Sequence, residues 1–318
     1  MASPDNPDNP DRPDEPEDPE LPGGPPDETF ALIGPGRAGT TVALALVDRG
    51  WRAVAVAGRA PDAASTTSAA ACLATVPALV SDAGRGARLV LIATPDRAIE
   101  QAAEVVAASL EPGALVVHLA GSRGLDAFAA LAGRRPDVRV GALHPLQSFP
   151  STSAGLERLA GSWAAVAGDE EVTRIARLLG LRPFPLADRD RVRYHAAAVV
   201  ASNHLVALLG QVERLAAACG VPFGAFEPLV RASLDNAFLL GPARALTGPV
   251  SRGDLGTVEG HLVALDPAER DAYRALAREA ARLTGRRDTA IDRLLGDVLQ
   301  AGGGRPGGED EGGAEPLR

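Results

Sequence analysis

The chain has 318 residues with 46% hydrophobic content, ample for buried cores, and a formal net charge of −9. Residues 1–28 carry ten of the acids, and the body between the two acidic ends holds 29 arginines against 27 acids, which gives no sign of nucleic-acid binding. The two cysteines form neither a disulfide framework nor a zinc cluster, no apolar run reaches the ~18 residues of a membrane span, and no signal peptide is recognisable. We therefore expect a cytoplasmic protein without metal, membrane or nucleic-acid partners.

All 32 basic residues are arginines. The abundance of Ala, Gly and Arg suggests a biased genome as the cause. The consequence for function is direct, because any mechanism that needs a catalytic lysine is excluded.

Both ends of the chain are predicted to be disordered. Residues 1–28 and 302–318 are rich in Pro, Gly and acids, so neither segment can bury enough apolar surface to fold. Between them, strand and helix patterns alternate as far as residue 187, which predicts an α/β domain over 29–187 with its core at 29–150. Only helical patterns follow, so residues 188–301 are expected to form an all-helical second domain.

Short apolar segments predict the strands of a mostly parallel sheet. They are residues 30–34, 51–58, 87–93, 114–121, 138–145, 162–168 and 182–187. A helix should follow the first strand and end at Arg49, before Gly50. After the third strand, Thr94 suits a helix N-cap and Pro95 the first helical position.

The second domain should contain four helices. The first spans residues 190–219 and ends before Gly220 and Pro222, and the second spans about 226–240. A loop at 246–256 follows. Asp266-Pro267-Ala268-Glu269 is a capping box that opens a helix to about Thr284, and residues 288–301 form the last helix.

A glycine-rich turn follows the first strand. Gly34, Gly36 and Gly39, with Arg37 and Ala38 between them, match G-x-G-x-x-G between a strand and a helix. The first glycine allows the tight turn, the second lets a pyrophosphate approach the backbone, and the third lets helix and strand pack closely. The helix N-terminus offers N–H groups to the phosphates. This context predicts a Rossmann-like dinucleotide site; a glycine-rich turn without a ligand is the alternative.

The end of the second strand indicates which dinucleotide binds. An NAD enzyme places Asp or Glu there, on the ribose 2′-hydroxyl. Here Gly58-Arg59 takes that place, and a guanidinium can bind a 2′-phosphate bidentately. We predict NADP, with Arg59 on the phosphate and Ser65, Thr66 or Thr67 as candidate helpers, although a solvent-facing arginine remains the alternative.

Polar groups follow three strands, at the edge where open α/β sheets bind substrates. They lie at residues 94–96, 121–123 and 144–148. His144 is a candidate proton donor to a carbonyl oxygen, because the ordinary pKa of histidine lies near neutral. Alternatively, His144 caps the strand end through a backbone bond. His118, inside an apolar strand, is expected to be structural.

The long helix carries polar residues in an apolar run. At about 100° per residue, His195, Val199 and Ser202 should share one face, with Asn203 nearby, whereas His204 should point away. Polar groups in such a run need partners when they are buried. They either line a cleft to the first domain or bond across the helical core, and we favour the cleft.

The loop at 247–254 is longer than a connection between two helices requires. Arg252 within it is a candidate clamp for a substrate carboxylate, and an ordinary loop is the alternative. Thr257 and His261 are one helical turn apart and could line the same pocket.

Three segments, HPLQSF, YHAAAVVASNHL and ALTGPVSRGDLGTVEGHL, carry a resemblance when taken with GPGRAG. Over about residues 29–290 the chain resembles the bacterial Rossmann-like oxidoreductases that end in domain of unknown function 2520. That family is similar to the 6-phosphogluconate dehydrogenase, ketopantoate reductase and pyrroline-5-carboxylate reductase group. The resemblance implies an NADP domain followed by a helical domain, similar to the C-terminal domain of 6-phosphogluconate dehydrogenase, that builds a homodimer.

The chain departs from part of this group. Ketopantoate reductases use a helix-borne lysine near an asparagine, and this chain has no lysine. If it reduces a similar substrate, His195 or His144 must replace the proton donor, with Asn203 as an orienting group. Pyrroline-5-carboxylate reductases need no lysine, and their glycine-threonine loop is similar in kind to residues 247–257.

These observations predict an NADP(H)-dependent oxidoreductase that passes hydride to or from a small oxo or imino acid. The predicted catalytic or substrate-binding residues are His144, His195, Asn203 and Arg252. The predicted cofactor-binding residues are Gly34, Gly36, Arg37, Ala38, Gly39, Arg59, Thr94 and Pro95. The alternative from another class is a non-enzymatic NADP-binding sensor or scaffold.

Overall fold

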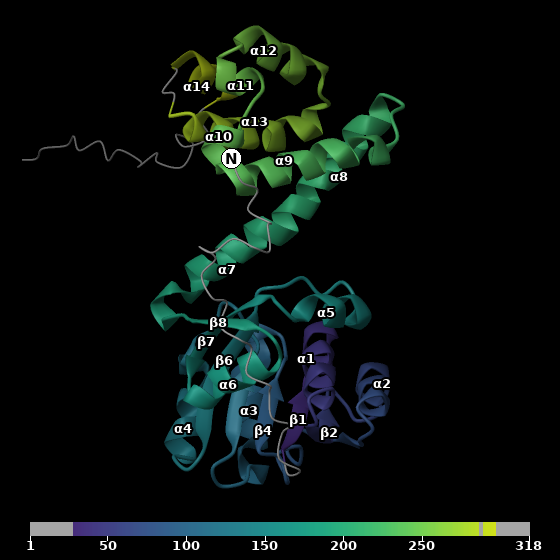
Figure 1. Cartoon of the computed structure of the whole chain (residues 1–318), viewed down its shortest axis with the longest axis vertical. Helices are drawn as coiled ribbons and strands as arrows, with labels where there is room; N and C mark the ends of the chain where they lie inside the picture. Colours follow the sequence, from purple (N-terminus) through teal and green to yellow (C-terminus); the bar gives the residue numbers. More distant parts are fainter. Residues whose placement is uncertain (1–27, 286–288, 297–318) are drawn as a thin grey trace, which may run out of the picture. The chain divides into compact units, whose positions relative to one another are not determined.

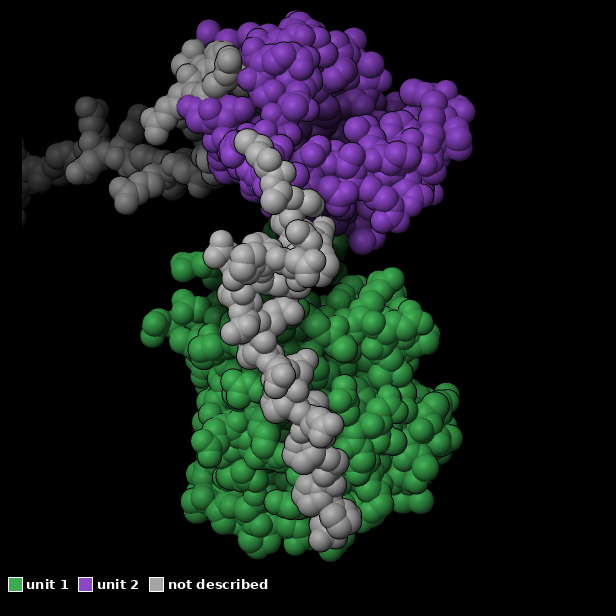
Figure 2. Space-filling view, in the orientation of Figure 1, with its two compact units in different colours: residues 1–204 green, residues 205–318 purple. Residues whose placement is uncertain are grey.

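The computed structural model describes residues 28–285 and 289–296, so nearly all of both predicted tails lies outside the described residues. The chain divides into two compact units, the first ending at His204 and the second beginning at Leu205 (Figures 1 and 2). The first unit therefore includes the start of the long helix, beyond the boundary at residue 187 that the sequence suggested.

The first unit is built on one sheet with the strand order β3-β2-β1-β4-β5-β6-β7-β8. The strands are β1 Thr29–Ile33, β2 Arg52–Ala57, β3 Pro77–Ala78, β4 Leu89–Ile92, β5 Leu115–His118, β6 Arg139–Pro145, β7 Trp163–Gly168 and β8 Arg182–Pro185. The seven strands predicted from apolar segments are confirmed. The additional strand, β3, has two residues and is too short for a periodic pattern to reveal.

Neighbouring strands of this sheet are parallel except β6 and β7, which are antiparallel. The strand order reverses between β1 and β4. Open sheets of this kind bind ligands at the carboxyl ends of the strands, beside such a reversal. The topology therefore points to the residues that follow β1, β4, β5 and β6.

Helices cover both faces of the sheet (Figure 1). Alternate residues of β1 enter two different cores, Phe30 and Leu32 on one face and Ala31 and Ile33 on the other. The helices of the first unit are α1 Arg37–Val47, α2 Ala64–Cys72, α3 Ile99–Val106, α4 Ala129–Arg134, α5 Thr152–Leu159, α6 Glu170–Leu178 and α7 Arg191–Val199. The core around Phe30 includes residues of α1 and α6, and the core around Ile33 includes residues of α3 and α4. The sheet is thus buried between two helical layers.

The described part of the second unit is helical, which confirms the predicted all-helical domain. Its helices are α8 Leu205–Ala218, α9 Glu227–Leu240, α10 Pro242–Ala245, α11 Pro249–Arg252, α12 Leu255–Ala264, α13 Pro267–Leu283 and α14 Thr289–Leu295. Val250, Val258, Leu262 and Ala277 form its small core, so α11, α12 and α13 pack on one another. The last predicted helix, 288–301, is observed as α14, and its end lies outside the described residues.

Two predictions in the second unit are wrong in detail. The segment predicted as a loop, 246–256, contains the helical turn α11, because Gly248 and Gly253 with φ of 102° and 75° bound a Pro-led turn. The predicted capping box starts α13 at the right residue, but the Asp266 side chain makes no cap hydrogen bond. The Glu269 carboxylate instead accepts from Arg214 at 2.6 and 3.1 Å.

The long helical run predicted at 190–219 is confirmed, with an interruption. A π-helical turn at Val200–His204 separates α7 from α8. The Ser202 hydroxyl donates to the carbonyl of Ala198 at 2.7 Å, and side chains that bond into the backbone ladder commonly distort helices. The simple 100° rule therefore fails beyond Val199.

This long helix is more apolar than the sequence analysis recognised. From Asp188 to Ala218 it has 31 residues, and its most apolar window has a mean hydropathy of 1.3 and is only 6% buried. By length and composition it could cross a membrane, which corrects the expectation that no segment reaches that measure. Phe238 and Leu239 of α9 are also 90% and 80% exposed. The long helix and α9 therefore leave several large apolar side chains exposed.

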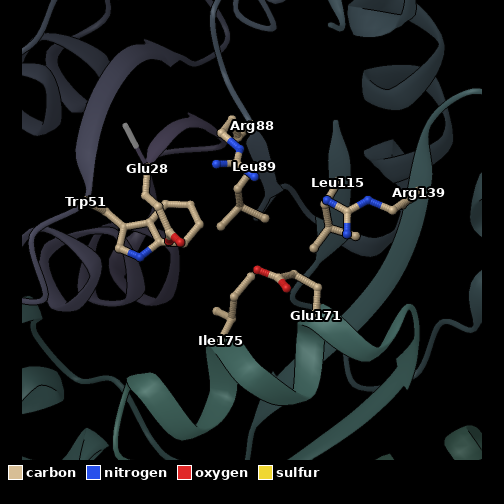
Figure 3. A pocket seen from close by; sticks show the side chains of 8 residues that line it. All are labelled: Glu28, Trp51, Arg88, Leu89, Leu115, Arg139, Glu171 and Ile175. Atoms are coloured by element: carbon tan, nitrogen blue, oxygen red, sulfur yellow. The ribbon is translucent and has the colours of Figure 1, made fainter. Parts of the chain in front are cut away.

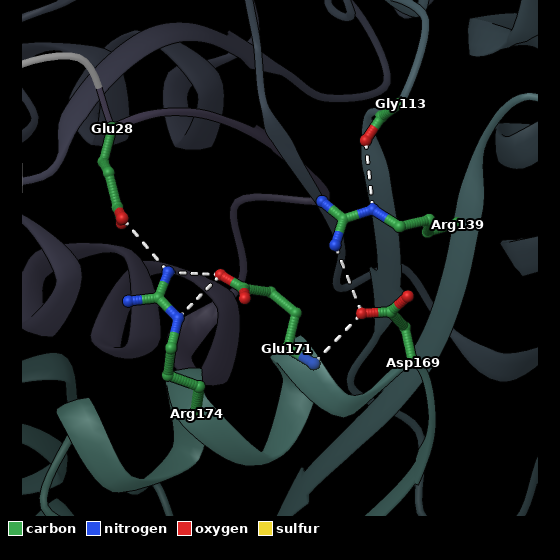
Figure 4. Close-up of polar contacts among 6 residues, drawn as sticks. All are labelled: Glu28, Gly113, Arg139, Asp169, Glu171 and Arg174. Atoms are coloured by element: carbon green, nitrogen blue, oxygen red, sulfur yellow. Dashed lines mark hydrogen bonds and ion pairs between the residues drawn. The ribbon is translucent and has the colours of Figure 1, made fainter.

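Charged residues close the edge of the sheet where the strands begin. Arg174 of α6 contacts Glu28 at 3.0 Å and also pairs with Glu171 (Figure 4). The guanidinium of Arg139 donates to Asp169 at 3.2 Å. Glu28 is only 5% exposed, and removing a carboxylate from water costs free energy. The ion pair with Arg174 offsets that cost.

A cavity of about 10 Å³ lies at this same edge (Figure 3). Glu28 and Trp51 line it, and the buried atoms Glu28 Oε2 and Trp51 Nε1 have no hydrogen-bond partner among the described residues. A cavity of this volume holds about one water molecule. This cavity therefore has room for a bridging water and nothing larger.

The two cysteines lie in different units. Cys72 is the last residue of α2, and Cys219 follows α8; both are free and exposed.

Candidate functional site

The glycine-rich turn between β1 and α1 has the geometry that a dinucleotide requires. Gly34 has φ of 91°, and a Cβ there would lie 2.6 Å from the Thr94 nitrogen. A Cβ on Gly39 would lie 2.6 Å from Ala93 Cβ, so α1 packs directly against the strand. A Cβ on Gly36 would meet no atom within 4 Å. The first and third glycines are thus required by close packing, whereas the second leaves the backbone open to a ligand.

The first turn of α1 completes this cradle. The N-cap residue Gly36 brings no side chain, and the first N–H groups of a helix, here those from Arg37 and Ala38 onward, lack partners within the helix. The Arg37 guanidinium donates to the Pro150 carbonyl at 3.1 Å, which directs the side chain toward the segment before α5. The open backbone and the helix N-terminus together fit a pyrophosphate group.

The residues predicted to read the adenosine ribose follow β2. Arg59 is exposed, and Gly58 before it packs on Thr66, whose Oγ1 would lie 2.1 Å from a Cβ. Thr66 is fully buried, and the Thr67 hydroxyl donates back into its own helix at 3.2 Å. Ser65 and Thr67 are both exposed, and of these two only the Ser65 hydroxyl has no hydrogen-bond partner among the described residues. Arg59 and Ser65 are therefore the two groups free to face a 2′-phosphate.

The prediction for the residues after β4 is partly wrong. Thr94 does not cap a helix: the short helix that follows begins at Asp96, and its N-cap is Pro95. The Thr94 hydroxyl is buried and has no partner among the described residues. Ser122, after β5, donates to Asp96. Thr94 therefore lies beside the glycine turn with its hydroxyl uncommitted.

Two of the predicted catalytic residues lie together at the end of β6. His144 Nδ1 and the Tyr194 hydroxyl are 2.8 Å apart, and the rings of His144 and His195 are 5.8 Å apart at 82°. Tyr194 and His195 come from α7. The sequence pattern assigns no role to Tyr194.

The loop after β5 makes room for this cluster at Gly121. A Cβ on Gly121 would lie 2.6 Å from His195 Nδ1 and 2.8 Å from His144 Nε2. Both distances are far below contact distance, so only glycine fits between the two imidazoles. We refer to His144, Tyr194 and His195 as the histidine–tyrosine cluster.

Burial determines the protonation states of His144 and Tyr194. Desolvation, helped by the nearby charges of His195 and Arg191, lowers the pKa of His144 to about 4. Desolvation raises the pKa of Tyr194 to about 12, against the influence of Arg191. The expectation that His144 titrates near neutral pH is therefore wrong, and at pH 7 it is a neutral imidazole.

His118 is structural, as its position in an apolar strand suggested. It is fully buried, its Nε2 lies 3.1 Å from the carbonyl of Gly124, and its ring packs on Phe128. Burial lowers its pKa to about 4. The same loop is held by Asp188, which accepts from the Leu125 N–H at 2.9 Å.

Arg191 is a buried residue that the sequence analysis missed. It begins α7, is 0% exposed, and donates through Nε to Asp188 at 3.2 Å. Its Nη1 and Nη2 atoms are buried without a partner among the described residues. Arg189 and Arg193 beside it are exposed, and composition could not distinguish the three. The spacing of Arg191, Tyr194 and His195 as i, i+3 and i+4 was the available signal.

The remaining predicted residues are exposed, and several of them have local partners. Asn203 is exposed on the π-helical turn, and its side chain accepts from Ser202 at 2.9 Å. Arg252 is exposed in the second unit. Thr257 donates to Asp254 at 2.7 Å, and His261 lies 2.8 Å from the Tyr273 hydroxyl. Their roles remain predictions.

Comparison with known families matches two successive parts of the chain to two different families. Residues 19–145 match the Rossmann-like domain, and residues 163–280 match the family described as a domain of unknown function (DUF2520). No curated protein matches the chain.

Solved structures share the fold. A proposed NADP oxidoreductase from Bacteroides fragilis is 24% identical, with a TM-score of 0.69, and the match covers 81% of this chain and 100% of that one. A Thermotoga maritima protein is also 24% identical, with a TM-score of 0.59 and the same coverage. Pyrroline-5-carboxylate reductase of Streptococcus pyogenes is 17% identical, with a TM-score of 0.54, over 80% of this chain and 98% of that one. With the two family matches, these likenesses identify the chain as a Rossmann-like protein that carries a C-terminal DUF2520 domain.

Proposed function

We propose that the protein is an NADP(H)-dependent oxidoreductase that transfers hydride to or from a small oxo or imino acid. The observation that carries this proposal is the position of the histidine–tyrosine cluster. His144 of this cluster lies at the end of β6, in the same mostly parallel sheet whose β1 is followed by the glycine turn, and sheets of this kind bind ligands along that edge. The similar Bacteroides fragilis protein is described as an NADP oxidoreductase, which supports the reaction class.

The choice of NADP rests on Arg59. Its guanidinium is exposed directly after β2, where an acid would repel a 2′-phosphate. Gly36 and the N-terminus of α1 would hold the pyrophosphate, and the free Thr94 hydroxyl offers a further hydrogen bond next to the turn. When bound, the nicotinamide would supply or accept the hydride.

Side chains of the protein would donate or accept the proton that accompanies hydride transfer. With His144 neutral, one ring nitrogen carries a proton and the other does not. If Tyr194 donates to Nδ1, then His144 Nε2 carries the proton and can donate a hydrogen bond to a substrate oxygen or nitrogen. A neutral imidazole polarises a carbonyl in this way without being a strong acid. His195, against the other side of Gly121, is the second candidate, and Asn203 and Arg252 remain candidates for orienting the substrate.

We also propose that the helical unit forms a homodimer in the cytoplasm. The support is the bare apolar surface of α8 and α9, where Val206 and Phe238 are 68% and 90% exposed. Burying such surface against a second copy is strongly favourable. Sedimentation at micromolar protein should then give twice the chain mass, and a monomer that partitions into lipid vesicles would favour a membrane surface instead.

The cofactor test is a titration of NADPH and NADH into the wild type and the Arg59→Ala variant. We expect Arg59→Ala to weaken NADPH binding at least about tenfold and leave NADH binding unchanged, because only NADPH has the phosphate. The matched control is Arg52→Ala, an exposed arginine at the other end of β2. Equal loss for both nucleotides would remove Arg59 from the phosphate site.

The reaction test is NADPH oxidation with small acids, including ketopantoate and pyrroline-5-carboxylate. Turnover on one of them supports the reductase. Tight NADPH binding without turnover on any of them would favour a non-enzymatic sensor. Replacing His195 with Ala should reduce turnover far more than NADPH affinity, and an equal loss of both would contradict a catalytic role for His195.

A further inference from the structure

Arg191 is a buried cation whose hydrogen-bonding capacity is mostly unused. The guanidinium stays charged in proteins and carries five N–H donors. Only Nε has a partner, Asp188, at 3.2 Å, while Nη1 and Nη2 are buried without one among the described residues. Burying an unpaired charge is costly, so such groups are normally matched by an acceptor. The two free nitrogens form the fork that binds a carboxylate bidentately.

The surrounding side chains leave this fork without a protein acid. Asp188 divides its two oxygens between Arg191 Nε and the Leu125 N–H. Asp96, at the end of β4, is held by Ser122. Two more buried polar atoms lack partners here among the described residues, His118 Nδ1 and His195 Nδ1. The region therefore has a surplus of unpaired buried groups around a fixed positive charge.

The position of Arg191 connects this surplus to the candidate active site. On α7, Arg191, Tyr194 and His195 are spaced i, i+3 and i+4 and share one helix face. Tyr194 bonds to His144, and His195 packs against Gly121 beside His144. The charge of Arg191 also contributes to the lowered pKa values of His118 and His144, which places it near both rings.

We infer that Arg191 is the anion anchor of this site, and that its Nη1 and Nη2 atoms bind the carboxylate of a small substrate. This inference rests on the proposed reductase function and names the group that selects an acid over its neutral analogue. It also moves the carboxylate clamp from Arg252, which is exposed in the second unit, to the unit that holds the histidine–tyrosine cluster.

The test compares binding of pyruvate and L-proline with binding of pyruvamide and L-prolinamide, in which an uncharged carboxamide replaces the carboxylate, to the full-length protein with and without NADPH. The wild type should bind the acids at least tenfold more tightly than the amides. Arg191→Met should abolish that preference, Arg191→Lys should keep part of it, and NADPH affinity should stay within twofold. Arg193→Met, an exposed arginine on the same helix, is the matched control.

A second measurement needs no variant at Arg191. In the wild type, the guanidinium nitrogen resonances of this buried arginine should shift when pyruvate or L-proline is added and stay unchanged with the amides. This keeps the test decisive if Arg191→Met fails to fold. Resonances that respond to no acid, or to inorganic phosphate only, would overturn the inference, because the fork would then hold water or a different anion.

The outcomes separate this inference from the proposed function. If NADPH binds and an acid turns over, but Arg191→Met keeps the same KM and the same preference for acids, the anchor is wrong and the reductase stands. If NADPH does not bind while the acids still shift the Arg191 resonances, the reductase fails and the anion anchor stands.

Discussion

The two edges of the sheet differ in whether their arginines are paired with acids. Where the strands begin, Arg174 and Arg139 are paired with acids, and the adjoining cavity of about 10 Å³ admits about one water. Where the strands end, Arg191 and Thr94 keep buried donors with no partner among the described residues. At the first edge the arginines have carboxylate partners and only Glu28 Oε2 and Trp51 Nε1 are left to a water, whereas at the second edge the Nη1 and Nη2 atoms of Arg191 are left without an acid among the described residues. The contrast assigns stability to the edge where the strands begin and ligand binding to the edge where they end, within one unit.

The largest expected effect comes from filling the space at Gly121. A methyl group there would overlap His144 and His195, so Gly121→Ala should lower turnover at least about 100-fold through misplaced imidazoles. NADPH affinity should change little. Steady-state kinetics on the substrate found in the screen would measure this. Gly133→Ala in α4, where a Cβ meets no atom within 4 Å, is the matched control, and equal rates for both variants would contradict a role for the cluster.

Acid should destabilise the edge where the strands end. Burial lowers the pKa values of His118 and His144 to about 4, below the ordinary value of about 6.5 that applies in the unfolded chain. Between these values the unfolded state takes up more protons, so stability is complete above about pH 6.5 and is lost as the pH falls toward 4, by on the order of 3 kcal/mol for each of the two histidines.

Urea unfolding at several pH values would test this slope. His118→Gln should flatten it, because the variant removes one buried imidazole. His204→Gln should leave it unchanged, because His204 is exposed. Parallel curves for the wild type and His118→Gln would contradict the burial argument.

At the other edge, removing a cation should cost stability and leave binding intact. Arg174→Met leaves Glu28 buried without its partner and should lower the free energy of unfolding by about 1–2 kcal/mol, reduced from the buried-pair value because Arg174 is half exposed. NADPH affinity should not change. Arg177→Met on the same helix is the control, and a loss of cofactor binding in Arg174→Met would break the division between the two edges.

The smallest expected effect tests the water at the cavity. Trp51→Phe removes the Nε1 donor and should cost less than about 1 kcal/mol. If a water joins Trp51 to Glu28, Trp51→Phe and Glu28→Gln should be non-additive in urea unfolding. Strict additivity would mean that no water connects them.

Much of the fold could be predicted because its strands and turns depend on local sequence patterns. Apolar strands such as 87–93 and the glycine turn at 34–39 depend on residues close in sequence, and the structure confirms that close packing requires glycine at Gly34 and Gly39. The predictions were wrong where contacts between residues far apart in the sequence determine the local structure. Asp266 makes no cap bond, and Glu269, the other acid of the predicted capping box, pairs instead with Arg214, 55 residues away.

The site was only half predictable for a similar reason. His144 and His195 stood out because the chain has only five histidines. Arg191 did not stand out among 32 arginines, and its burial depends on Asp188 and the loop after β5. The protonation state of His144 depends on burial, which no sequence pattern reports.

The two free cysteines turn the division of the chain into an experimental advantage. Cys72 lies in the first unit and Cys219 in the second, and both are exposed. A donor and an acceptor dye can therefore be attached to the natural sequence, one on each unit, without adding or removing a thiol. Energy transfer between the two dyes would report any change in the distance between the labelled cysteines while NADPH and pyruvate are added in turn.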